Sequence, residues 1–243
     1  MILNLWRCEM SNEAEMHEKN GFVILRGCIQ HELILDLQSY AGDFLKCDAN
    51  PSAIIQAMED LESTNKDVFY QFCKKMGHII PTIRIATQPK ILNLIQEITK
   101  FKNLHLVDSA VFFNKESVKR LQYDWHQEQA YFPNASEVMT MWYPWLTPVN
   151  NANGTMVMAS GGHKKVFARE RINVTDGLTQ MRISDDDLQE FEKIECDLNL
   201  GDAVIFTYMS PHRTGHNSSG TPRTTIITRF TGEVGAYANG FSA

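Results

Sequence analysis

The spacing of apolar residues changes near residue 104, from a helical period to short runs of β-branched and aromatic residues. Before this point apolar residues recur every three or four positions, as at Leu33, Leu37 and Phe44, which places them on one face of a helix. After it the short runs are separated by Gly, Asn, Pro and Ser, the pattern of strands and turns. We predict an early strand at 21–25 and later strands at 106–113, 138–145, 155–159, 203–209 and 224–230.

The whole chain, 1–243, is predicted to form a single domain, since a chain of this length can share one core and no linker or low-complexity tract interrupts it. Residues 1–103 are expected to form a mainly helical packing layer on a β core at 104–232. Residues 233–243 are expected to form a tail. Several short strands with turn signals between them favour a sandwich or a barrel.

One helical insertion is expected within the β core, near residues 164–193. Ser184 is followed by Asp185, Asp186 and Asp187. A serine cap followed by negative charge is typical of the first turn of a helix, because both complement the exposed amide groups and the helix dipole there. We therefore predict a helix that begins at Ser184.

Composition favours a protein that binds small molecules. Hydrophobic residues make up 43% of the chain and charged residues 21%, with a formal net charge of −6, which argues against nucleic-acid or membrane-surface binding. The five cysteines are odd in number and never spaced as C-x-x-C, so we expect reduced thiols and a cytoplasmic location. No signal-peptide pattern or membrane-spanning run is visible. The sequence does not indicate an oligomeric state.

An imidazole and a carboxylate stand two residues apart in the segment Trp125-His126-Gln127-Glu128. On a strand such residues project from the same face, so His126 and Glu128 can bind one ion. We expect the third ligand to be His212, at the end of the strand predicted at 203–209. Two histidines and one carboxylate on one side of a ferrous ion leave positions open for a bidentate cosubstrate and dioxygen. These three residues are the predicted metal ligands and catalytic residues.

Arg223 is the candidate for binding a cosubstrate. It follows His212 by 11 residues, beyond the turn-forming sequence Asn217-Ser218-Ser219-Gly220. A connection of this length can return the chain to the next strand and direct the guanidinium toward the metal. A guanidinium binds a carboxylate through two parallel hydrogen bonds, so Arg223 suits the distal carboxylate of 2-oxoglutarate.

Six separate segments now make the chain resemble the phytanoyl-CoA dioxygenase family of iron(II)- and 2-oxoglutarate-dependent oxygenases. The similarity spans about residues 16–232 and begins with an opening segment typical of the family, Lys19 to Gly27. The matching segments follow in the family's order: His126-Gln127-Glu128 with Tyr131-Phe132-Pro133, Asn153-Gly154-Thr155, Ser160-Gly161-Gly162-His163-Lys164, Gly201-Asp202, His212-Arg213-Thr214-Gly215, and Pro222-Arg223.

The resemblance implies a fold, a ligand set and a cosubstrate site. The fold would be α+β with a mainly β core, a double-stranded β-helix (jelly roll, cupin-like) flanked by N-terminal helices. His126, Glu128 and His212 would hold Fe(II), and Arg223 would hold 2-oxoglutarate. Thr214 matches a hydroxyl-bearing position near the same carboxylate. An aromatic residue before the Asn-Gly turn often lies against the cosubstrate in relatives; Tyr143 is the nearest match, and Trp142 is the alternative.

Three residues depart from the family pattern or compete with it. Glu128 stands where the family has Asp, but its longer side chain still reaches a metal, and a carboxylate here favours hydroxylation over halogenation. His216 is the alternative to His212, and the spacing to Arg223 and the Thr-Gly pair favour His212. His163 is expected to organise a loop at the rim of the site rather than to bind iron.

The function predicted from these residues is that of a dioxygenase using Fe(II), 2-oxoglutarate and O2. It would hydroxylate an unactivated C–H bond of a small-molecule metabolite and release succinate and CO2. Two alternatives stay open. One is a cupin-type metal-dependent dioxygenase or isomerase that does not use 2-oxoglutarate. The other is a non-catalytic binding protein on the same scaffold.

Overall fold

The computed structural model describes residues 10–115, 122–175 and 178–232. Within residues 10–100 there are six α-helices: α1 (Asn12–Asn20), α2 (His31–Leu45), α3 (Pro51–Thr64), α4 (Lys66–Met76), α5 (Ile80–Ala86) and α6 (Pro89–Thr99). Local sequence sets several of their ends. Asn50, for example, accepts a hydrogen bond from the Ala53 backbone at 3.0 Å, and Pro51 occupies the first turn of α3.

A five-stranded antiparallel sheet forms the centre of the molecule. Its strand order is β1-β8-β3-β10-β2. A smaller antiparallel sheet, β7-β4-β9, faces it, and β5 and β6 form a separate hairpin. The strands are β1 (Phe22–Leu25), β2 (His105–Asn114), β3 (Met139–Pro144), β4 (Met156–Ala159), β5 (Glu170–Thr175), β6 (Leu178–Arg182), β7 (Lys193–Glu195), β8 (Ala203–Thr207), β9 (His212–Thr214) and β10 (Arg223–Thr231).

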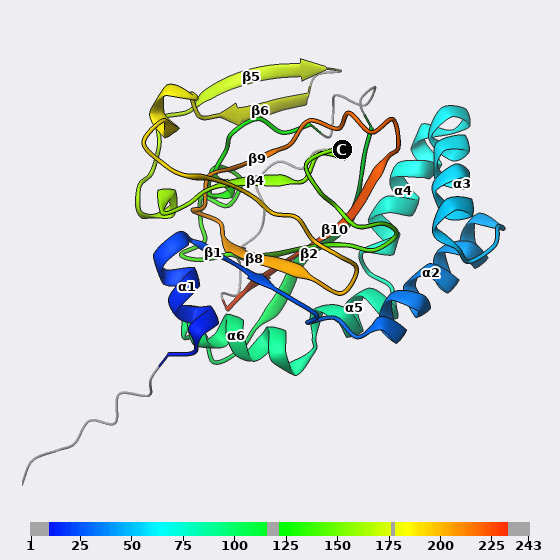
Figure 1. Ribbon diagram of the computed structural model, residues 1–243, viewed down its shortest axis with the longest axis horizontal. Helices are drawn as coiled ribbons and strands as arrows, with labels where there is room; N and C mark the ends of the chain where they lie inside the picture. The colour runs from blue at the N-terminus through cyan, green and yellow to red at the C-terminus, as the bar shows by residue number, and fades with distance from the viewer. Residues whose placement is uncertain (1–9, 116–121, 176–177, 233–243) are drawn as a thin grey trace, which may run out of the picture.

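The large sheet separates two apolar clusters because its strands alternate. Met141, Ile205 and Ile226 point to the face covered by the helices and join the largest core cluster. Trp142 and Val204 point the other way, into the space between the two sheets. Figure 1 shows helices along one side of the sheet and the β5–β6 hairpin at the top of the view, with α5 and α6 at the bottom. No helix in the described ranges is long and apolar enough to span a membrane.

The strands predicted at 21–25, 106–113, 138–145, 155–159, 203–209 and 224–230 are confirmed as β1, β2, β3, β4, β8 and β10, with ends shifted by at most two residues. The helical layer before residue 104 is confirmed as well. The two facing sheets form the predicted double-stranded β-helix.

The helical insertion predicted near 164–193 is wrong. The described residues there form the β5–β6 hairpin and two single 3-10 turns, η3 (Gly162–Lys164) and η4 (Asp186–Leu188). Ile172 and Val174 are β-branched and alternate with exposed residues, which favours a strand. The Ser184 hydroxyl accepts from the Asp186 backbone at 3.3 Å, but the residue in the cap position of η4 is Asp185, which makes no side-chain cap hydrogen bond. This turn ends at Leu188, and strand β7 begins five residues later.

Gly77 lets the end of α4 contact strand β2 directly. A β-carbon at this position would lie 2.0 Å from the backbone oxygen of Ser109. We expect Gly77→Ala to lower the free energy of unfolding by about 1–3 kcal/mol, the usual cost of overpacking, as measured by urea denaturation. Lys75→Ala is the control, since its side chain is exposed. Equal stability of both variants would contradict the close approach of α4 and β2.

Candidate metal centre and cosubstrate site

The imidazoles of His126 and His212 are brought together by a backbone bridge. The two residues exchange N–H···O=C hydrogen bonds, each 3.0 Å long, and their rings lie 4.2 Å apart between centroids. Glu128 does not continue as a strand but begins a 3-10 turn, η2 (Glu128–Ala130). Potential ligand atoms of all three side chains lie within 4.8 Å of one another, and all three residues are buried. This donor set suits a metal ion.

Each histidine is oriented by a hydrogen bond to a backbone carbonyl. Nδ1 of His126 lies 2.7 Å from the oxygen of Asp124, and Nδ1 of His212 lies 2.9 Å from the oxygen of Ser210. Since a carbonyl only accepts, Nδ1 carries the proton in both rings and Nε2 keeps its lone pair for a metal. Burial lowers the pKa of His126, and burial with the neighbouring His126 lowers the pKa of His212 to about 3. Both imidazoles are therefore neutral at physiological pH, the state that binds metal.

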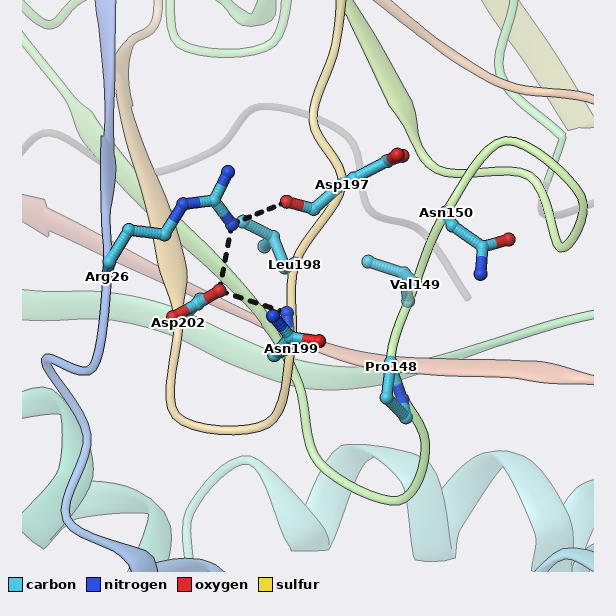
Figure 2. Close-up of a pocket in the computed structure, with 8 residues that line it drawn as sticks. All are labelled: Arg26, Pro148, Val149, Asn150, Asp197, Leu198, Asn199 and Asp202. Atoms are coloured by element: carbon cyan, nitrogen blue, oxygen red, sulfur yellow. Dashed lines mark hydrogen bonds and ion pairs between the residues drawn. The ribbon is translucent and has the colours of Figure 1, made fainter.

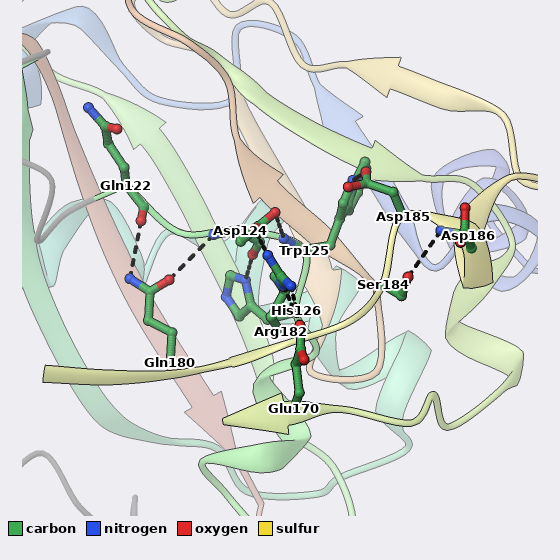
Figure 3. A network of polar contacts seen from close by, with 10 residues as sticks. All are labelled: Gln122, Asp124, Trp125, His126, Glu170, Gln180, Arg182, Ser184, Asp185 and Asp186. Carbon is green, nitrogen blue, oxygen red and sulfur yellow. Dashed lines mark hydrogen bonds and ion pairs between the residues drawn. The ribbon is translucent and has the colours of Figure 1, made fainter. Parts of the chain in front are cut away.

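The segment carrying His126 is braced by the β5–β6 hairpin and the turn after it, as Figure 3 shows. Gln180 accepts from the Asp124 backbone at 3.4 Å and donates to the Gln122 carbonyl at 3.1 Å. The indole of Trp125 donates to Asp185 at 3.0 Å, and the Trp125 carbonyl accepts from the Ile183 backbone at 2.7 Å. The hairpin and the turn after it thus hold the residues that come directly before His126.

Arg223 is a buried cation without a carboxylate partner among the described residues. It begins β10 and is 3% exposed. Its Nη1 donates to the Gly154 carbonyl, and its guanidinium lies 5.5 Å from the centre of the Trp142 ring. Its buried Nε has no hydrogen-bond partner in the part of the chain that the structure describes. Burial alone lowers its pKa to about 10, so it stays charged near neutral pH. A buried guanidinium in this state is prepared to receive an anion.

Of the two aromatic candidates, the structure places Trp142 beside Arg223. Tyr143, the next residue on β3, points to the opposite face and packs in the helix-side cluster. Thr214 projects from the same face of β9 as His212, and its hydroxyl accepts from the Tyr123 backbone at 3.1 Å. Trp142 thus lies beside the guanidinium of Arg223, whereas Tyr143 lies on the other face of the sheet.

The two competing histidines lie away from the metal-ligand cluster. His216 is exposed in the connection between β9 and β10. His163 packs against α1, where its ring lies 6.5 Å from that of His17. The sequence predicts His212 at the end of β8. In the structure it instead begins the separate strand β9 in the small sheet. A turn at Tyr208 and Met209 follows β8, and Pro211 comes directly before β9.

The sequence interpretation missed one prominent group at the site, Arg229. Its guanidinium donates to both oxygens of Glu128, from Nε and Nη2, each at 2.7 Å, and to Asp108 at 3.2 Å. Burial opposes ionisation of Glu128, yet Arg229 holds the pKa of this carboxyl at about 2. A possible signal was the even spacing between Arg223 and Arg229, which puts both arginines on one face of a single strand.

The pocket drawn in Figure 2 is separate from this centre. It has a volume of about 480 Å³ and is lined by Arg26, Pro148, Val149, Asn150, Asp197, Leu198, Asn199 and Asp202. Asp202 accepts from Arg26 at 2.8 Å and from the backbones of Gly27 at 2.8 Å and Asn199 at 3.0 Å. The Gly201-Asp202 segment of the sequence pattern therefore joins two loops and does not contribute to the metal centre.

A double-stranded β-helix with two histidines and one carboxylate clustered inside it defines a class of metal-dependent proteins. The sequence profile of the family "Phytanoyl-CoA dioxygenase (PhyH)" matches residues 17–225. The chain belongs to this family. Comparison with curated protein sequences finds no match.

Solved structures with the same fold include three enzymes of low sequence identity. The non-heme monooxygenase ThoJ in its apo form has a TM-score of 0.65 and 18% identity, covering 90% of this chain and 76% of its own. The epimerase SnoN in complex with Fe3+, alpha ketoglutarate and nogalamycin RO has a TM-score of 0.62 and 16% identity, covering 90% and 82%. EctD from S. alaskensis, with 2-oxoglutarate and 5-hydroxyectoine, has a TM-score of 0.59 and 14% identity, covering 92% and 78%.

Proposed function

We propose that this chain is an Fe(II)- and 2-oxoglutarate-dependent dioxygenase that hydroxylates an unactivated C–H bond of a small-molecule metabolite. The observation that carries the proposal is the pairing of two features in one β-helix. One is a buried cluster of His126, Glu128 and His212 with ligand atoms within 4.8 Å. The other is Arg223, a buried guanidinium whose Nε has no hydrogen-bond partner within residues 10–115, 122–175 and 178–232.

The three clustered residues fit iron(II) because they supply two neutral nitrogens and one ionised carboxylate. Three protein ligands on one side leave the rest of an octahedral ion open. When bound, ferrous iron would supply the redox chemistry that couples decarboxylation of 2-oxoglutarate by O2, to succinate and CO2, with oxidation of the substrate. The protein's part is to orient these ligands and to exclude water.

Arg223 is proposed to anchor the distal carboxylate of 2-oxoglutarate. The contrast with Arg229 supports this role. Burial opposes the charge of both arginines, but the carboxylates of Glu128 and Asp108 raise the pKa of Arg229, whereas nothing offsets burial at Arg223. An incoming carboxylate would supply the missing counter-charge. Trp142, against which Arg223 stacks, would form one apolar wall of this subsite, and Thr214 is proposed to lie near the same carboxylate.

Hydroxylation is the proposed outcome because Glu128 supplies a carboxylate as the third metal ligand. Without this carboxylate a halide could bind the metal at the same position, which would favour halogenation. Small molecules are the proposed substrates, in line with the acidic net charge. SnoN, an epimerase, and ThoJ, a monooxygenase, show that this fold supports more than one outcome.

The test is conversion of 2-oxoglutarate to succinate by the purified chain with iron(II) in air, stimulated by members of a metabolite panel. We expect at least one metabolite to increase succinate formation and to gain one oxygen atom, detected by mass spectrometry. The control is His126→Ala, which removes a ligand candidate. Succinate formation equal to that of His126→Ala with every metabolite would contradict the proposal.

A further inference from the structure

Glu128 lies over a row of three polar side chains that crosses the large sheet. Arg229 on β10 is in register with Thr140 on β3 and with Asp108 on β2. All three point into the interior between the sheets, because they share the face that carries Trp142. The pairing of β10 with β2 shifts register directly after Arg229. Such irregularities re-aim side chains next to functional sites.

The two oxygens of Glu128 are not equivalent in this arrangement. Among the described residues, Oε2 accepts from Nε of Arg229 at 2.7 Å and from the Thr140 hydroxyl at 3.1 Å, whereas Oε1 accepts from Nη2 of Arg229 alone, at 2.7 Å. A carboxylate oxygen has two lone pairs in its plane. Oε2 therefore has both occupied, and Oε1 keeps one available.

We infer that Arg229 is a positioning residue, which holds Glu128 so that it binds the metal through Oε1 alone. This inference rests on the proposed function and deepens it. Glutamate has one more rotatable bond than aspartate, so a free Glu128 would lose more conformational entropy when it binds a metal. The paired hydrogen bonds from Nε and Nη2 of Arg229 remove this freedom before a metal binds. Asp108 and the Phe132 ring, 5.8 Å from the guanidinium, in turn hold Arg229.

The positioning role and the positive charge of Arg229 predict opposite effects on metal affinity when this residue is replaced. As a cation next to a metal site, Arg229 repels the metal, so simple loss of its charge would strengthen metal binding. As a support for a ligand, its loss weakens binding, and outer partners of metal ligands are typically worth about 10 to 100-fold in affinity. Lysine separates the two effects, since it keeps the charge but cannot form two parallel bonds to one carboxylate.

The experiment is calorimetric titration of the apo protein with Mn2+ alone, without cosubstrate. We expect Arg229→Lys to bind Mn2+ about 10-fold or more weakly than the unmodified chain. Arg84→Lys is the matched control, because Arg84 forms an ion pair with Asp36 at 2.9 Å on the exposed side of the helical layer. Circular dichroism and the thermal midpoint would confirm that each variant folds.

A second variant tests the paired hydrogen bonds from the guanidinium to Glu128. Arg229→Ala leaves space for a guanidinium ion, and millimolar guanidinium is expected to restore at least part of the Mn2+ affinity, whereas methylammonium of equal charge is not. Arg229→Lys with unchanged or increased Mn2+ affinity would overturn the inference, as would equal rescue by both cations. An unmodified chain that fails to bind Mn2+ would overturn the proposed function as well, so the two failures are distinguishable.

Discussion

His212→Ala is expected to weaken binding of Mn2+ or Fe2+ by roughly 100-fold or more and to abolish succinate formation. The substitution removes one of three ligand candidates and leaves His126 and Glu128, which cannot fix an octahedral ion alone. Outer partners of a metal ligand are already worth about 10 to 100-fold, so loss of a ligand should cost more. Anaerobic titration calorimetry measures the affinity, and a succinate assay measures turnover.

His216→Ala is the matched control for this experiment. His216 lies four residues further along the same segment, is exposed, and belongs to no metal-ligand cluster among the described residues. Its replacement should leave both affinity and turnover within about twofold, as is usual for surface substitutions away from a site. If the effects of the two variants were exchanged, His216 would be the ligand and the geometry of strand β9 described above would be wrong.

The sequence located the metal-ligand candidates because their chemistry is visible without coordinates. Imidazole and carboxylate groups at His126, Glu128 and His212 stand in an ordered set of segments. The sequence did not show how the three meet. His126 and Glu128 were expected on one strand, but His126 forms an isolated bridge and Glu128 opens a 3-10 turn. Such short elements have too few residues for any periodicity to be detected.

Three of the strands that could be predicted, β3, β8 and β10, lie deep in the core. β3, β8 and β10 are almost wholly buried and β-branched or aromatic, so their patterns are long enough to detect. β7 and β9 have three residues each, and their pairing depends on contacts far away in the sequence. The segment 184–188 shows the opposite failure. Ser184 and the three aspartates after it match the start of a helix, yet only one 3-10 turn forms, because local signals do not fix helix length.

Arg229 and the choice between Trp142 and Tyr143 required coordinates for a different reason. Both depend on which face of a strand points inward, and a shift of one residue exchanges the faces. In a buried strand with apolar residues on both faces, such as β3, sequence alternation does not reveal this. The register of β3 against β10 shows which residues share a face: Trp142 lies opposite Ile227 and Thr140 opposite Arg229, so all four lie on the face toward the small sheet.

Arg223→Ala is expected to raise the KM for 2-oxoglutarate by roughly a hundredfold, since truncating one partner of a buried, hydrogen-bonded charge pair costs about 2–5 kcal/mol. The KM of Arg223→Lys should lie between those of Arg223→Ala and the unmodified chain, because lysine retains the charge but cannot form the two parallel hydrogen bonds. Mn2+ affinity should change by less than about threefold. Initial rates of succinate formation against 2-oxoglutarate concentration, and the same calorimetric titration, provide the measurements.

The thermal midpoint of Arg223→Ala distinguishes cosubstrate binding from a structural role. Arg223 is a buried charge with no carboxylate partner in the described parts of the chain, so removing it relieves an uncompensated desolvation cost. We therefore expect the variant without cosubstrate to be about as stable as the unmodified chain. Added 2-oxoglutarate should raise the midpoint of the unmodified chain but not that of the variant. Metal-dependent activity that survives Arg223→Ala unchanged would instead indicate a cupin-type enzyme that does not use 2-oxoglutarate.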